Sequence, residues 1–227
     1  MALPYDLSLK MVGWGTTMVV CGLLGTVFLF RSARKGALES TKKVNRGIAL
    51  FFYAYVFTRL FFFMSDLERR DHGETIVYAR WVVTAYLFSL SSILFLISVG
   101  ERYLLTTERK WLSKLTLALL GACATFAVAS YFVDSLVLLG AARTLMYASS
   151  AIFALTLAVV YGKLILQSTG AIRRNSILTM SGLVITVVGI LIDSEFLFRL
   201  LGNFIWLPGI LASVGLLIFA FGQRTIR

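Results

Sequence analysis

Residues 77–99 have the sequence VYARWVVTAYLFSLSSILFLISV, in which Arg80 is the single charged side chain. An α-helix of about 20 mainly apolar residues crosses the roughly 30 Å of hydrocarbon in a bilayer. This stretch has the length and composition of such a helix. It therefore predicts a transmembrane span and places the protein in a membrane.

Six further stretches of the same kind occupy almost all of the remaining chain of 227 residues. The seven predicted spans are 9–30, 47–65, 77–99, 113–133, 141–165, 175–194 and 203–222. Hydrophobic residues make up 59% of the chain and charged residues 15%, against about 45–50% and about 25% in soluble domains. We expect an all-α, multi-pass integral membrane protein of the cell or cytoplasmic membrane, with residues 1–227 forming one seven-helix domain.

The charged residues predict how the spans are oriented. If the spans alternate in direction, one face of the membrane collects 15 of the 22 basic residues and only three acids, whereas the other face has seven basic residues and eight acids. Cytoplasmic loops carry the excess of Lys and Arg in membrane proteins. The sequence therefore predicts an N-terminus outside and a C-terminus inside.

The net charge of +11 follows from this basic inner rim. Lys and Arg beside a membrane interact favourably with anionic lipid head groups, and the same rim could dock a protein partner in the cytoplasm. Nucleic acid is not an expected partner, because the basic residues lie in short juxtamembrane loops without an element that reads bases.

Ionisable residues inside spans are costly in hydrocarbon and usually face the interior of the bundle or water. Four spans each carry a polar stripe, which we define as polar side chains spaced to share one helix face. The stripes are Tyr55, Arg59 and Asp66; Arg80, Thr84 and Ser91; Arg143, Tyr147 and Ser150; and Thr179, Thr186 and Asp193.

If the four stripes converge, they form an outward-facing, arginine-lined pocket with Glu195 and Arg199 at its rim. Guanidinium groups suit carboxylates, phosphates and sulfates, because their donors form a planar fork. The alternative is structural, with the arginines snorkelling to head groups or clamping neighbouring helices. The candidate ligand-binding residues are Arg59, Arg80, Arg143, Asp66, Asp193, Tyr55, Thr84 and Tyr147.

The chain offers little for catalysis, metals or cofactors. His72 is the only histidine and lies with four acids in a predicted loop, 66–76. We expect this loop to be a solvated surface rather than a weak cation site. A zinc protease site, a histidine-dependent nucleophile and a phosphate-binding glycine loop are all missing. Cys21 and Cys123 lie inside spans as small apolar packing residues. We therefore expect a non-enzymatic protein without a cofactor.

Tyr78-Ala79-Arg80-Trp81, followed by Thr84, resembles the third-helix pattern of microbial rhodopsins, Tyr-Ala-Asp-Trp followed by Thr. The resemblance implies a seven-helix bundle with its N-terminus outside. It departs at the chemistry, because Arg80 replaces the acidic counter-ion and span 203–222 has no lysine for a retinal Schiff base. A retinal pigment is therefore not expected.

The sequence favours a receptor- or sensor-like protein that binds an anionic or amphiphilic ligand, or a lipid, in the outward-facing pocket. Two alternatives stay open. The first is a structural subunit of a larger membrane complex, in which the same charges clamp helices. The second is a small transporter or channel, for which broken helices or a deep carboxylate would be expected.

Overall fold

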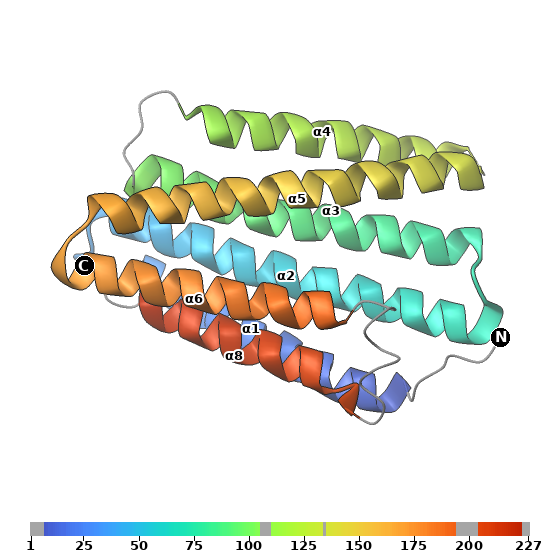
Figure 1. Ribbon diagram of the computed structural model, residues 1–227, viewed down its shortest axis with the longest axis horizontal. Helices are drawn as coiled ribbons and strands as arrows, with labels where there is room; N and C mark the ends of the chain where they lie inside the picture. The colour runs from blue at the N-terminus through green and yellow to red at the C-terminus, as the bar shows by residue number, and fades with distance from the viewer. Residues whose placement is uncertain (1–6, 105–109, 134, 194–203, 224–227) are drawn as a thin grey trace. The chain divides into compact units, whose positions relative to one another are not determined.

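The computed structural model describes residues 7–104, 110–133, 135–193 and 204–223, and in these ranges every regular element is a helix (Figure 1). A short π-helix, η1 (Gly100–Leu104), follows α3 directly. The seven α-helices are α1 (Leu7–Ala33), α2 (Glu39–His72), α3 (Ile76–Val99), α4 (Trp111–Phe132), α5 (Leu136–Gln167), α6 (Gly170–Ile192) and α8 (Leu207–Gln223).

Six of these helices, α1 to α6, are long and apolar enough to cross a membrane. The predicted all-helical class is therefore confirmed, and the helices are those of a multi-pass membrane protein. The last helix, α8, is also apolar but has 17 residues, which corresponds to about 26 Å.

The helix α2 extends well beyond its predicted span of 47–65. It has 34 residues and continues to His72, so most of the predicted loop 66–76 is helical. The added residues include Leu67, Glu68, Arg69 and Arg70, which are good helix formers, so the helix does not need to end where the apolar stretch ends.

The described helices gather into two compact units. The first unit comprises Gly25–Val160, and the second comprises Ala2–Leu24 with Tyr161–Arg227. Both α1 and α5 contribute residues to each unit. The sequence-based expectation of a single domain over 1–227 stays a prediction.

In the first unit, α2 and α3 form an antiparallel helical hairpin (Figure 1). Gly73 makes the turn with φ of +80°, a conformation that glycine adopts without steric cost. The Thr75 hydroxyl then accepts a hydrogen bond from the Tyr78 amide at 3.1 Å and caps the start of α3. Farther along, Phe61 stacks between Trp81 and Phe88, with ring centroids 5.7 and 5.2 Å away.

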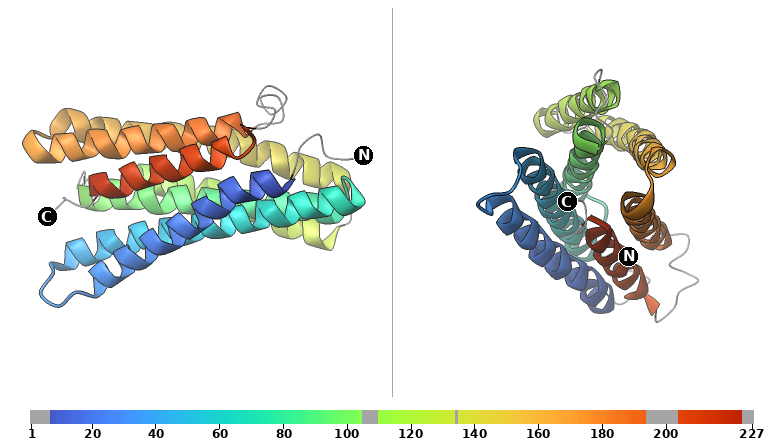
Figure 2. Two further views of the ribbon diagram at one scale, coloured as in Figure 1. Left: turned by 90° about the horizontal axis from the view of Figure 1, so that it is seen from below. Right: turned by 90° about the vertical axis from the view of Figure 1, so that its left-hand side faces the viewer.

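In the second unit, α6 and α8 lie side by side (Figure 2). Their contact is made by glycines spaced seven residues apart, Gly182 and Gly189 on α6 with Gly215 and Gly222 on α8. A Cβ atom added at any of these four would come within 3.0 Å of a backbone atom of the other helix. Small residues allow such close approach between membrane helices.

The π-helix η1 contains a buried acid that the sequence did not single out as structural. Glu101, in η1, is only 1% exposed. Its carboxylate accepts hydrogen bonds from the amides of Leu112 and Ser113, at 3.1 and 2.8 Å, and from the Ser113 hydroxyl. These amides belong to the first turn of α4, where a negative charge is stabilised by the helix dipole.

Candidate functional site

Arg59 is a buried arginine on α2, with 6% of its surface exposed. Its Nη2 and Nε atoms donate to the hydroxyl of Tyr55, one turn earlier, at 2.8 and 3.3 Å. The guanidinium also lies over the rings of Tyr55 and Phe62, 5.1 and 5.7 Å from their centroids. Tyr55 and Arg59 therefore lie on one face of α2.

Arg143 is the second arginine of the site and lies on α5. It is half-buried, and Tyr147, one turn later on the same helix, lies beside its guanidinium. Tyr78 and Tyr86 of α3 also lie near it. Within the described part of the chain, Arg143 forms no ion pair with a carboxylate.

Tyr86 lies between the two arginines, because it packs against Phe62, whose ring lies under the Arg59 guanidinium, and against Tyr147, one turn from Arg143. Its ring meets Phe62 edge-on at a centroid distance of 5.3 Å and Tyr147 at 4.9 Å. We call Arg59, Arg143, Tyr78, Tyr86 and Tyr147 the two-arginine cluster. It draws on α2, α3 and α5, all within the first unit.

Arg80 and Thr84, which were predicted to join the same pocket, contact the end of α4. The Arg80 Nη2 atom donates to the carbonyl oxygens of Ser130 and Tyr131, each at 3.3 Å, and the guanidinium lies 5.3 Å from the Tyr131 ring centroid. The Thr84 and Tyr131 hydroxyls are 2.7 Å apart. Arg80 thus satisfies carbonyls at a helix C-terminus, where a cation is favourable.

The two candidate aspartates lie in different units. Asp66 is half-buried on α2, in the first unit. Asp193 follows α6 in the second unit, with its Oδ1 atom 3.8 Å from Nζ of Lys10. The other predicted rim residues, Glu195 and Arg199, lie outside the described residues.

The polar stripe on α6 is used for helix packing. A Cβ at Gly215 would lie 2.5 Å from the Thr186 hydroxyl, and a Cβ at Gly222 would lie 2.6 Å from the Thr179 hydroxyl. The Gln223 amide nitrogen also donates to Thr179 at 3.2 Å. Thr179 and Thr186 therefore face α8 within the second unit.

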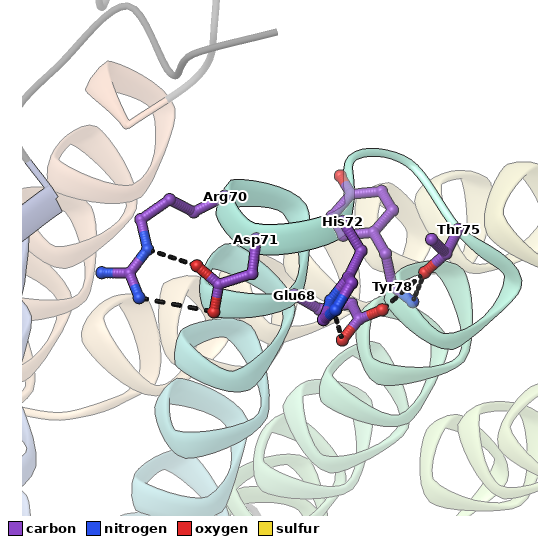
Figure 3. Close-up of polar contacts among 6 residues, drawn as sticks. All are labelled: Glu68, Arg70, Asp71, His72, Thr75 and Tyr78. Carbon is purple, nitrogen blue, oxygen red and sulfur yellow. Dashed lines mark hydrogen bonds and ion pairs between the residues drawn. The ribbon is translucent and has the colours of Figure 1, made fainter.

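The hairpin between α2 and α3 is closed by side-chain contacts near Tyr78 (Figure 3). Glu68 accepts a hydrogen bond from the Thr75 hydroxyl at 2.9 Å, and its other carboxylate oxygen lies 3.4 Å from Nδ1 of His72. Beside them, Arg70 donates to Asp71 at 2.7 Å. That hydrogen bond lowers the pKa of Asp71 below its ordinary value and raises the pKa of Arg70.

Sequence reasoning identified three members of the two-arginine cluster, Arg59, Arg143 and Tyr147, and gave Tyr78 and Tyr86 no ligand role. A tyrosine inside an apolar span has no distinctive spacing signal, because it also serves as an ordinary packing residue. No group of three or more potential metal ligands occurs among the described His, Cys, Asp and Glu residues. The cluster offers guanidinium and phenol groups, which are donors for an anion.

Comparison with known protein families, curated proteins and solved structures finds no match to this chain.

Proposed function

We propose that the protein is a non-enzymatic, seven-span membrane receptor or sensor that binds an anionic ligand at the two-arginine cluster. In this proposal the N-terminus lies outside, the basic rim lies inside, and α8 is the seventh span. The ligand accepts hydrogen bonds from the guanidinium groups and the surrounding phenols. A protein partner on the basic inner face would receive the signal.

The observation that carries the proposal is the environment of Arg143. This guanidinium lies seven residues inside α5, or about 10 Å from the helix start. Its contacts in the described part of the chain are with tyrosines and not with a carboxylate. A charge at such a position is costly unless it is paired or hydrated, and a bound anion would supply the pairing.

The neighbouring Arg59 adds a second donor group to the same site. Arg59 lies over the Phe62 ring, which packs against Tyr86, and Tyr86 packs against Tyr147, one turn from Arg143. A carboxylate or phosphate beside Tyr86 would be attracted by both positive charges, and charge-assisted hydrogen bonds from a guanidinium are about twice as strong as neutral ones.

Binding of anions to purified protein tests the proposal directly. Unfolding midpoints should be measured with oleate, acetate and inorganic phosphate for the wild type and for Arg143→Gln. We expect at least one of these anions to stabilise the wild type and to bind the variant at least about tenfold more weakly, the loss expected for one charge-assisted hydrogen bond. Arg70→Gln is the matched control, because Arg70 is an exposed arginine paired with its neighbour Asp71.

Equal anion binding by Arg143→Gln and the wild type would refute the ligand site. Native mass spectrometry of protein purified gently from its own membrane then separates the alternatives. A retained small anion or lipid supports the receptor, whereas a stoichiometric protein partner with no small molecule would make the chain an assembly subunit.

The orientation is tested by labelling single cysteines in intact cells with a membrane-impermeant maleimide. Glu74→Cys, in the α2–α3 hairpin, should react from outside. Lys42→Cys, near the start of α2, should react only after the membrane is opened. The reverse pattern would contradict the predicted orientation.

A further inference from the structure

We infer that the ligand of the two-arginine cluster is an amphiphile, with an anionic head group and a long apolar chain, that reaches the site sideways from the bilayer. This inference rests on the proposed function and specifies its ligand class. Three features of the first unit carry it: a closed hairpin end, an open flank at Tyr147, and a strip of exposed alanines beside that flank.

The hairpin end of the cluster is covered by side chains that hold one another in place. Tyr78, which interacts with Arg143, is only 9% exposed. The Arg69 guanidinium lies 5.7 Å from the centroid of the Tyr78 ring, and its Nη2 atom is 2.8 Å from a Glu74 carboxylate oxygen. The hydrogen bond between Glu68 and Thr75 closes the same turn (Figure 3).

A water-soluble anion arriving past this hairpin would have to displace Tyr78 and its contacts. Around the buried Tyr78 ring, these contacts are the ion pair between Arg69 and Glu74 and the hydrogen bond from Thr75 to Glu68. Tyr78 and the contacts around it therefore cover the cluster on the side of the α2–α3 hairpin.

The flank formed by Tyr147 is open. Tyr147 is 52% exposed, although it lies 11 residues inside α5, or about 16 Å from the helix start. It lies beside Arg143, one turn earlier on the same helix, and its ring contacts that of Tyr86. Tyr147 is therefore the most exposed residue of the cluster, and it lies one helical turn from Arg143.

A strip of exposed alanines continues along α5 from Tyr147. Ala151 and Ala154 are exposed on the same helix face, at i+4 and i+7, and Ala148 is exposed beside them. The strip ends at Leu155, which is 68% exposed. From Tyr147 to Leu155 the strip extends for about 12 Å, and small side chains let an apolar chain approach a helix backbone closely.

These features fit an amphiphile better than a small anion. The head group would reach Arg143 and Tyr86 past Tyr147, while the apolar chain would lie over the alanines at the same depth in the bilayer. A small anion such as phosphate would have contacts only with the cluster and would have to cross apolar surface to make them.

The experiment compares probes that share an anionic group but differ in chain length. Protein in nanodiscs of zwitterionic lipid is titrated with oleate, acetate and inorganic phosphate, and the unfolding midpoint is followed. We expect oleate to raise the midpoint and the two short anions to leave it unchanged at tenfold higher concentration. Tyr147→Phe, which keeps the ring, should weaken oleate binding by about fivefold, the loss expected for one neutral hydrogen bond.

A larger side chain on the strip tests the position of the apolar chain. Ala151→Phe should weaken oleate binding at least fivefold. Ala122→Phe is the matched control, because Ala122 is also an exposed alanine within an apolar helix, α4, and it should bind oleate like the wild type. Unliganded midpoints of all variants report whether they fold.

The outcomes separate this inference from the proposed function. Equal stabilisation by acetate, phosphate and oleate, with Ala151→Phe behaving like the wild type, would overturn the amphiphile and leave an anion site in place. Oleate binding that is unaffected by Arg143→Gln would overturn the proposed function itself. A wild-type protein that responds to none of the three probes would overturn both.

Discussion

Gly215→Ala should destabilise the second unit by forcing α6 and α8 apart. The added Cβ would lie 2.5 Å from the Thr186 hydroxyl and 2.6 Å from both the Gly182 carbonyl oxygen and the Thr186 amide nitrogen. Two of these three atoms belong to the backbone, so the helices have to separate by roughly 0.5–1 Å to restore ordinary contact in a close-packed interior.

The magnitude follows from two opposing effects. Overpacking a well-packed contact costs about 1–3 kcal/mol, whereas alanine is favoured over glycine in a helix by up to about 1 kcal/mol. Gly162→Ala in α5 should show only the gain in helix propensity, because a Cβ at Gly162 meets nothing within 4 Å. We therefore expect Gly215→Ala to be less stable than Gly162→Ala by about 1–3 kcal/mol.

The buried cysteines provide the assay. Cys21 is fully buried in the second unit, and Cys123 is fully buried in the first. In a Cys123→Ser background, labelling by a thiol-reactive dye during heating reports exposure of Cys21. For a protein of this size the stability difference corresponds to a midpoint lower by about 2–12 °C. Equal midpoints for the two alanine variants would refute the close backbone contact.

Three further predictions concern other contacts. Glu101→Gln should lower the free energy of unfolding by about 1–2 kcal/mol and speed hydrogen exchange at the Leu112 and Ser113 amides. Glu39→Gln, at an exposed ion pair with Lys43, should change neither. Thr17 is bonded to Gly209 and Ser213 across α1 and α8, so Thr17→Val should lose about 0.5–1.5 kcal/mol in thermal unfolding, with Thr16→Val as the control that loses only a bond within its own helix. The hydrogen bond from Arg70 lowers the pKa of Asp71, so this bond is present at pH values above the lowered pKa and is lost as the pH falls through it. Arg70→Gln should therefore raise the pKa of Asp71 in an NMR titration.

The positions of the helices could be predicted from hydropathy, since long apolar stretches have few other uses. The predicted spans 77–99 and 113–133 end within two residues of α3 and α4. The end of α2 was placed too early, because hydropathy reports where the hydrocarbon ends, and the polar residues up to His72 continue the helix beyond it.

Contacts one helical turn apart were also predictable. Arg59 donates a hydrogen bond to Tyr55, and Tyr147 lies beside Arg143, because an i, i+4 spacing fixes side chains on one face whatever surrounds the helix.

Which neighbour each face meets could not be predicted. Arg80 contacts α4, and Thr186 faces α8, although both belong to polar stripes like that of Arg59. A stripe of polar residues reports a buried or hydrated face, but the identity of the helix opposite depends on tertiary packing. Glu101 was missed for the same reason, since its partners lie 11 and 12 residues later in the sequence.

The bonds made by Glu101 also bear on how the protein can be engineered. The Glu101 carboxylate ties the beginning of α4 directly to η1, and the described residues on either side of this connection are Leu104 and Lys110. An epitope or a small fluorescent domain inserted between those two positions should leave both helices in place. The α3–α4 connection is therefore the site we would choose for a tag that reports on the basic face in living cells.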